Sequence, residues 1–221
     1  MKSHKLIFIG IVSAMVLLGS CTTVFINEIS RKQDFSFSDS NLKTAIVIGT
    51  EDVVLNDFIK TFYRNYSDYH KFVADYVGQF TGSLNNANIL ARVESDTSFR
   101  WGSEIYYSYF AKDKMTSDSV LIRYGANYLI RISGLEVSNR VQTSMIPGGS
   151  NTPPIYKTSE HCIVKARFQV FDLKTQQNVM EFITYGEGTV VLLTYQEAFN
   201  EAIKKSIAHA VEYLKSGKKE F

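Results

Sequence analysis

The sequence predicts an α/β (α+β) domain: a single three- to five-stranded mixed sheet, packed by a long helix and a C-terminal amphipathic helix. Three observations support this prediction. Residues 119–137 have the pattern of a short helix that Gly125 ends, followed at once by an apolar strand. Residues 55–84 repeat apolar side chains at the three- and four-residue spacing of a helix, and residues 194–217 do the same near the C-terminus. Helices alternating with apolar strands are typical of helices layered on a sheet.

The first 21 residues have the pattern of a bacterial lipoprotein signal peptide. Lys2 and Lys5 precede an apolar run over residues 6–18, which has signal-peptide length and is short for a membrane-spanning helix. The run ends in Leu-Gly-Ser-Cys, which resembles the motif whose cysteine receives lipid. We therefore expect lipidation of Cys21 and a stable di- or triacyl (palmitate-type) anchor. The alternative is an ordinary signal peptide or N-terminal anchor with an incidental cysteine.

Removal of the signal peptide changes the charge balance. It takes away two lysines and no acid, so 24 Lys+Arg become 22 and equal the 22 Asp+Glu. A neutral mature chain gives no reason to expect nucleic acid as a partner. Thr22 after the cysteine favours the bacterial outer membrane, with the protein facing the periplasm; the inner membrane and the cell surface stay open. We divide the chain into a signal peptide (1–20), the lipidated cysteine and a tether (21–43), and one α/β domain (44–217).

The first half of the domain predicts two strands after a polar lead-in. Residues 22–41 are rich in Ser and Asp and are expected to be a mobile tether. Residues 44–49, TAIVIG, form a compact apolar run typical of a buried strand. Residues 89–94, ILARVE, alternate and indicate a second strand.

The long helix lies between these strands. Residues 55–84 carry an aromatic stripe, which we assign to the core rather than to a partner-binding face. Asn56 is its candidate N-cap and Gly82 lies near its expected end. The run is longer than an average helix, so a break is expected near residues 65–68.

The second half predicts a strand, a loop and a hairpin. Residues 128–143 form an apolar strand with a bulge or kink near Gly134. Residues 146–155 hold all three prolines and predict a loop. Residues 163–186 contain two alternating runs joined by a polar turn, which indicates a β-hairpin.

The C-terminal helix has clear end signals. Gly186 and Gly188 suggest a break in the chain before it. Thr194 and Glu197 form a capping box, in which each side chain satisfies a backbone N–H of the first turn. Gly217 stands where the helix should stop.

The segment 95–114 is the candidate contact surface. It has no clean period and holds the only tryptophan. Trp, Tyr and Arg are over-represented among residues that dominate binding energy at interfaces. The alternative is that these rings pack over one end of the sheet. The candidate partner contacts are Arg100, Trp101, Tyr106 and Tyr107.

Two segments resemble a group of envelope proteins. Residues 124–130, Tyr-Gly-Ala-Asn-Tyr-Leu-Ile, are similar to the Gly-Ala-Asp-Tyr step before a strand, and residues 168–175 are similar to a strand followed by Asp and a Thr-Gly turn, with Gln176 in place of the glycine. The order of elements over residues 44–214 resembles the α/β domain of the curli-secretion lipoproteins, the lipoprotein activators of penicillin-binding proteins and the TolB N-terminal domain. The resemblance implies a non-enzymatic protein that binds partners or assembles into rings.

Motifs for catalysis or cofactors do not stand out in the sequence. His70, His161 and His209 have no metal-ligand spacing to another ligand residue. His161 and Cys162 are adjacent, so on a strand they point to opposite faces and cannot form a nucleophile–base pair. With Cys21 lipidated, Cys162 has no disulfide partner and is expected to be a small buried residue. We expect no cofactor, no metal and no catalytic residue.

Three functions follow as hypotheses. The first is a non-enzymatic, periplasm-facing lipoprotein that binds a protein partner in cell-envelope assembly or secretion. The second is a ring-forming structural subunit of a secretion apparatus, held together by self-association. The third is a small-molecule-binding or enzymatic domain with a cleft at the sheet edge.

Substitution of the candidate contacts separates the first two hypotheses. For a binding module, Trp101→Ala or Arg100→Ala should lower the yield of partner crosslinks in cells about tenfold, since truncation of such residues commonly costs more than 1 kcal/mol of binding. The protein should then be a monomer or dimer. Large particles in detergent, insensitive to both substitutions, would instead support the ring.

Overall fold

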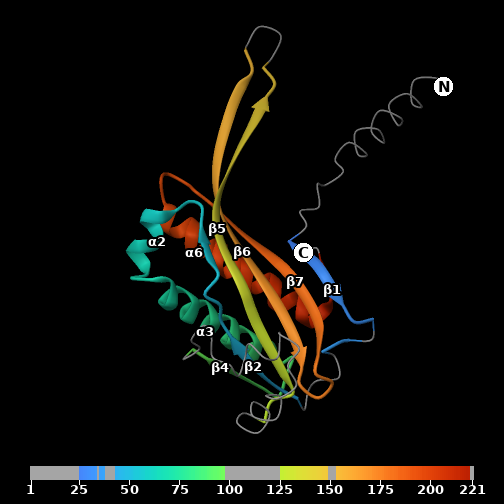
Figure 1. Cartoon of the computed structure of the whole chain (residues 1–221). Helices are drawn as coiled ribbons and strands as arrows, with labels where there is room; N and C mark the ends of the chain where they lie inside the picture. The colour runs from blue at the N-terminus through green and yellow to red at the C-terminus, as the bar shows by residue number, and fades with distance from the viewer. Residues whose placement is uncertain (1–24, 34, 38–42, 98–124, 149–152, 220–221) are drawn as a thin grey trace, which may run out of the picture.

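The computed structural model describes residues 25–33, 35–37, 43–97, 125–148 and 153–219 (Figure 1). This part of the chain forms an α+β domain with one mixed sheet of seven strands and three helices. No helix within it is both long and apolar enough to cross a membrane. The elements are β1 (Ile26–Arg31), β2 (Thr44–Ile48), β3 (Val53–Leu55), α2 (Ile59–Asn65), α3 (Tyr69–Ala87), β4 (Arg92–Asp96), β5 (Tyr128–Ile146), β6 (Ile155–Asp172), β7 (Gln177–Thr189) and α6 (Tyr195–Ser216).

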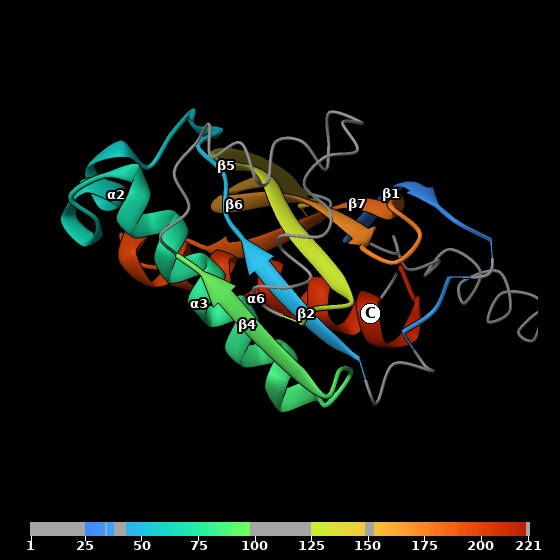
Figure 2. The same ribbon diagram turned by 60° about the horizontal axis from the view of Figure 1, so that its bottom comes forward.

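The sheet is antiparallel at one side and parallel at the other. Its order is β1-β7-β6-β5-β2-β4, with β3 beside β5. β1, β7, β6 and β5 pair antiparallel, whereas β2 pairs parallel to both β5 and β4. Figures 1 and 2 show α3 and α6 side by side across one face of the sheet. The core lies between these two layers.

The predicted fold class and mixed sheet are confirmed, but the predicted number of strands, three to five, is too small. The two strands that the sequence did not reveal are β1 and β3. β1 lies in residues expected to be a tether; it pairs with β7 although it carries only one buried apolar side chain, Ile26. β3 has three residues and lies beside the bulged part of β5. Both strands depend on backbone pairing, which leaves little periodicity in the sequence.

Most of the aromatic stripe of the long helix lies in the core, as predicted, but Tyr63 and Tyr69 are exposed. Phe72, Tyr76 and Phe80 of α3 are fully buried and face rings of the sheet and of α6. The Tyr76 hydroxyl lies 2.7 Å from Ser206 Oγ, which in turn lies 3.0 Å from Thr184 Oγ1. This buried chain of hydroxyls satisfies three polar groups and links α3, α6 and β7.

The predicted break in the long helix is also confirmed, while its predicted ends are wrong. Asp68 accepts a 2.9 Å hydrogen bond from the Lys71 amide and starts α3. The residue at the N-cap of α2 is Phe58 rather than Asn56. Gly82 lies inside α3, which continues to Ala87 and ends at Asn88 in the left-handed conformation. A helical glycine is tolerated at modest cost, so Gly82 alone does not end the helix.

Gly186 and Gly188 lie within β7 rather than in a break. A Cβ on Gly186 would lie 1.9 Å from the Ala202 carbonyl oxygen, and one on Gly188 would lie 1.9 Å from that of Ala198. The two glycines therefore let the backbone of α6 approach the sheet closely. The start of α6 differs from the capping box too, because Thr194 Oγ1 donates to the Val191 carbonyl instead of accepting from the helix. Its end at Gly217 is as predicted.

The strands around the proline-rich loop are longer than predicted. β5 has a bulge between Ile132 and Gly134, as expected, and continues to Ile146. β6 begins at Ile155, whereas the sequence indicated a strand only from residue 163. The predicted hairpin over residues 163–186 is confirmed by the pairing of β6 with β7. The unpredicted first part of β6 pairs only with β5 and has no core to face, so it lacks the apolar alternation of a buried strand.

Adding a methyl group at these glycines tests the close approach of α6. We expect Gly186→Ala to lower the free energy of unfolding by about 1–3 kcal/mol, because the methyl would collide with helix backbone. Gly82→Ala is the matched control: its Cβ would meet nothing within 4 Å, and alanine favours the helix by about 0.5–1 kcal/mol. Urea unfolding followed by circular dichroism measures both. Equal stability of the two variants would contradict the packing.

Candidate functional site

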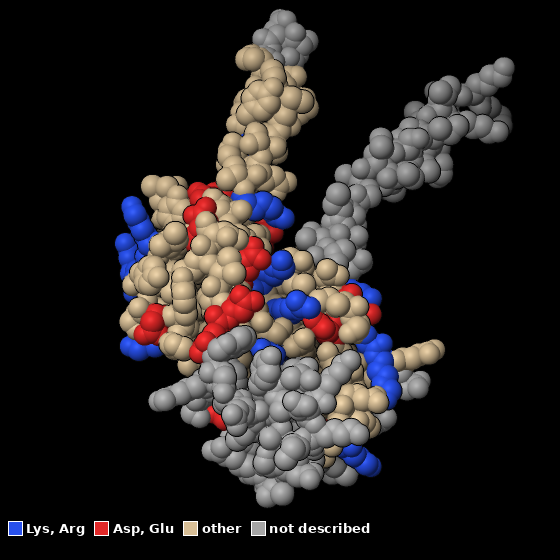
Figure 3. Space-filling model, viewed as in Figure 1, with Lys and Arg blue, Asp and Glu red and all other residues tan. Residues whose placement is uncertain are grey.

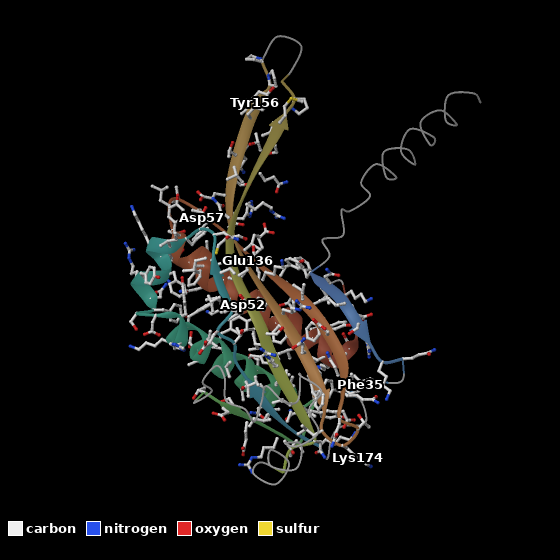
Figure 4. The ribbon with its side chains drawn as sticks, in the orientation of Figure 1. Phe35, Asp52, Asp57, Glu136, Tyr156 and Lys174 are labelled. Carbon is white, nitrogen blue, oxygen red and sulfur yellow. The ribbon has the colours of Figure 1, made fainter. Side chains whose placement is uncertain are left out.

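β5 and β6 together extend beyond the rest of the sheet. The pairing of β7 with β6 ends at Thr189 opposite His161, whereas β5 and β6 stay paired up to Ile146 opposite Ile155. We call residues 141–148 and 153–160 the arm. Figure 1 shows it projecting from the body, with no helix against it, and Figure 4 places Tyr156 near its far end. A two-stranded ribbon is marginally stable by itself, so the arm depends on the body that continues both strands.

The surface of the arm is apolar at its tip and nearly uncharged. Among its described residues only Lys157 and Glu160 are charged. In the space-filling view the arm is tan over most of its length, in contrast to the charged body (Figure 3). The exposed large apolar side chains are Val141, Met145, Ile146, Ile155 and Tyr156, each with at least 50% of its surface accessible. Such a concentration, on a projection against which none of the described helices packs, is typical of a contact surface.

A polar cluster lies at the base of the arm. On β6, Ser159 and His161 are two residues apart and so share one face. Ser159 Oγ lies 2.8 Å from His161 Nε2, and His161 Nδ1 lies 2.6 Å from Glu187 Oε1 on β7. Arg140 on β5 pairs with the other oxygen of Glu187 at 2.5 Å. Side chains alternate along β6, and Cys162, next to His161, is fully buried against the helices. Ser159 and His161 therefore lie on the opposite, outer face of the sheet.

A second set of hydrogen bonds fixes the arm from the helix side. Glu160 accepts 2.9 Å and 3.1 Å hydrogen bonds from Asn139 and from the Tyr195 hydroxyl at the start of α6. The Glu160 carboxylate raises the pKa of Tyr195 above its ordinary value, because it stabilises the protonated hydroxyl. The arm is therefore fastened to the body on both faces.

A groove of about 370 Å³ adjoins the cluster on the outer face of the sheet. Its walls combine apolar rings with the Arg140–Glu187 ion pair. His209 supports the groove from α6: it stacks on Phe25 at 4.3 Å and its Nδ1 donates to the Tyr185 carbonyl. Burial lowers the pKa of His209. The groove is lined by Phe25, Ser138, Asn139, Arg140, Ile163, Tyr185 and Glu187.

The loop between β7 and α6, which follows the end of β7 at the base of the arm, exposes two leucines. Leu192 and Leu193 are 93% and 78% accessible, and both adopt the left-handed backbone conformation, with φ of 49° and 64°. This conformation is uncommon for leucine and persists only where the surrounding structure imposes it. Tyr195, two residues after Leu193, lines a hollow of about 320 Å³ together with residues 57–61. We call Val191, Leu192, Leu193, Ile59 and Tyr63, all exposed, the end surface.

The residues singled out in the sequence meet different outcomes. Cys21 and the candidate contacts Arg100, Trp101, Tyr106 and Tyr107 lie outside the described residues, so their roles stay predictions.

Cys162 is fully buried, as predicted. Burial, with a smaller contribution from the Asp57 charge, raises the pKa of its thiol to about 12, so the thiolate needed for nucleophilic attack does not form at neutral pH. Within the described ranges, no group of three or more His, Cys, Asp or Glu side chains could hold a metal ion.

Sequence reasoning missed the cluster of Ser159, His161 and Glu187. The spacing of Ser159 and His161 was visible, but residues 155–162 were not predicted as a strand. Glu187 comes from a neighbouring strand and reaches His161 only through the register that sets His161 opposite Thr189. Such a register is not encoded in local periodicity.

Comparison with known proteins adds structural likeness only. No protein-family model and no curated protein matches the chain. Similar solved structures include the PelC dodecamer of Paraburkholderia phytofirmans, with 9% identity, a TM-score of 0.46 and coverage of 86% of this chain and 97% of that chain. A putative neuraminyllactose-binding hemagglutinin homolog of Helicobacter pylori has 12% identity, a TM-score of 0.42 and coverage of 86% and 89%.

Lipoprotein GNA1162 of Neisseria meningitidis is a further structure of this kind, with 10% identity, a TM-score of 0.30 and coverage of 66% and 83%. The structures similar to this chain thus include one named as a lipoprotein. At these TM-scores the likeness says nothing about what the chain binds, and the resemblance to the curli, penicillin-binding-protein activator and TolB group stays a prediction.

The reactivity of Cys162 tests its burial. In the folded Cys21→Ser variant, we expect Cys162 to resist a thiol reagent at pH 8, because its thiol is buried and protonated. In urea the same thiol should react within seconds. The absorbance released by an aromatic disulfide reagent follows both reactions. Rapid modification of the folded protein would contradict the burial.

Proposed function

We propose that this chain is a lipid-anchored protein of the bacterial cell envelope that binds a protein partner, in envelope assembly or secretion, through its arm. The observation that carries the proposal is the arm itself: two strands leave the sheet and end in exposed apolar side chains. The predicted lipidation of Cys21 supports the location, at the outer membrane facing the periplasm. A second copy of the chain, as in a ring-forming subunit, is the alternative partner.

The arm offers backbone groups as well as side chains. Among the described strands, none pairs with β5 beyond Val137 on the edge away from β6, and none pairs with β6 before His161 on the edge towards β7. Strand edges of this kind accept an added strand from another chain. Such pairing would supply main-chain hydrogen bonds, while Met145 and Tyr156 would supply apolar contact area.

The predicted anchor favours an arm on the membrane side. β1 runs antiparallel to β7, so the first residues of β1, next to Phe25, are those nearest the arm. Cys21 precedes Phe25 by only four residues, a reach of about 14 Å when extended. A partner that meets the arm would therefore be at, or close to, the membrane surface.

Site-specific photo-crosslinking tests the proposal in the full lipoprotein in its own cells. A photoreactive amino acid replaces Tyr156 at the tip, and Lys174 at the opposite end of the body serves as the matched control position (Figure 4). We expect one dominant foreign envelope protein from position 156 and none from position 174. Met145→Asp should reduce that crosslink about tenfold or more, because a buried charge costs several kcal/mol.

The other outcomes decide between the hypotheses. A high-mass ladder of crosslinks to the chain itself would replace the foreign partner by the ring-forming subunit. Equal crosslinking from positions 156 and 174, or none from either, would overturn the arm as the binding surface. The Cys21→Ser variant shows whether membrane attachment is needed: release of this variant from the membrane fraction is expected, and its retention would contradict the lipid anchor.

A further inference from the structure

We propose that Ser159, His161 and Glu187 form a catalytic triad at the base of the arm and hydrolyse carboxylic esters. The proposal goes beyond partner binding. It differs from the non-enzymatic function expected from the sequence. It names specific residues for the third hypothesis, a small-molecule-binding or enzymatic domain with a cleft at the sheet edge.

The three side chains meet the geometric requirements of a nucleophile, a base and an orienting carboxylate. The nucleophile and base must be within hydrogen-bond distance, and Ser159 Oγ lies 2.8 Å from His161 Nε2. The base must be held through its other nitrogen, and His161 Nδ1 lies 2.6 Å from Glu187 Oε1. Each ring nitrogen thus has a separate partner, in the order hydroxyl, imidazole, carboxylate.

The contacts also select the tautomer that the reaction needs. A carboxylate accepts only, so the proton of a neutral His161 ring lies on Nδ1 and is donated to Glu187. Nε2 then carries the lone pair and, at 2.8 Å, is the nearer acceptor for the Ser159 hydroxyl, whose other acceptor is the Gln142 carbonyl oxygen at 3.4 Å. Arg140 holds the second oxygen of Glu187 at 2.5 Å, which fixes the orientation of that carboxylate. Thr189 Oγ1, 3.3 Å from Nδ1, lies on the same side of the ring.

The base and the orienting carboxylate are more buried than the nucleophile, as such a site requires. The His161 side chain is 11% accessible and that of Glu187 is 22% accessible, so the hydrogen bond between them is largely shielded from solvent. Ser159 is only partly buried and can meet a substrate from solvent. The arm does not need this network to stay in place, because Asn139 and Tyr195 fasten it separately through Glu160.

The reaction proceeds by acyl transfer. Ser159 Oγ attacks the ester carbonyl carbon while its proton passes to His161 Nε2, and Glu187 stabilises the resulting imidazolium. The bond from carbon to the leaving oxygen then breaks, and His161 Nε2 returns the proton to the departing alcohol. Water next gives a proton to Nε2 and attacks the acyl-serine. The Ser159 oxygen leaves and recovers its proton, so the net change is ester and water to acid and alcohol.

Neighbouring residues point to the substrate class. The register sets Gln142 opposite Ser159 and Arg140 opposite His161, so an amide donor and a guanidinium share the face on which the oxyanion would form. The adjoining groove offers Phe25, Ile163 and Tyr185 to an apolar group. Because these donors are side chains rather than a rigid pair of backbone amides, an ester with a good leaving group suits the site better than a peptide bond. The expected substrate is an uncharged ester with a short apolar chain.

An activity-based probe tests the triad on the full chain in detergent. A fluorophosphonate should form a covalent adduct that peptide mass spectrometry places on Ser159. Ser159→Ala should abolish the adduct and lower kcat/KM for p-nitrophenyl butyrate by about 100-fold or more. Ser133→Ala is the matched control, because Ser133 is a β5 serine outside the arm whose hydroxyl donates to the Arg167 carbonyl, and should leave both unchanged.

The conservative Glu187→Gln separates catalysis from a structural network. It should reduce labelling and kcat at least tenfold while circular dichroism shows an unchanged fold, because glutamine cannot stabilise the imidazolium. Absence of an adduct on the folded protein, an adduct away from Ser159, or ester hydrolysis that Ser159→Ala leaves unchanged would overturn the proposal. The cluster would then be only a hydrogen-bond network at the base of the arm. Photo-crosslinking at Tyr156 does not depend on this result, so partner binding and hydrolysis stand or fall separately.

Discussion

The antiparallel pairing of β5 with β6 is the constraint on which the rest of the structure depends. It runs from Tyr128 opposite Asp172, inside the core, to Ile146 opposite Ile155, beyond every other strand. The buried half is anchored by apolar side chains against α3 and α6, which offsets the entropy of ordering the exposed half. The same pairing therefore builds the body, projects the arm and fixes which side chains face each other at its base.

Close approach of α6 to β7 completes the body and sets what lies beside the arm. Gly186 and Gly188 remove the side chains that would hold the helix away, and the Tyr76–Ser206–Thr184 hydroxyl chain occupies the same layer. Glu187, between them, points to the outer face as Tyr185 does, because side chains alternate along a strand. The packing of the helix side and the polar chemistry of the outer side thus come from one short segment.

The core was predictable because its signals are local. Phe72, Tyr76 and Phe80 repeat at helical spacing, and the strand at residues 44–49 is almost wholly apolar, so both appear in a single sequence. β1 and the first part of β6 were missed because pairing, not burial, holds them, and polar residues such as Ser159 carry no strand signature there. The Gly186 and Gly188 signals were present but ambiguous: a glycine in a strand indicates a turn or a close neighbour, and only the position of α6 decides.

Register explains why the candidate site was less predictable than the fold. Arg140, His161 and Glu187 come from three strands and meet because β5, β6 and β7 pair in one alignment; a shift of one residue would turn their side chains to the opposite face. That alignment is held by the buried side of the same strands, where Cys162 adjoins His161 and two glycines flank Glu187. A partner strand added to the arm would lie next to β6 and so beside Ser159. Binding at the arm and chemistry at its base would then share one strand, and an occupied edge would narrow access to the serine.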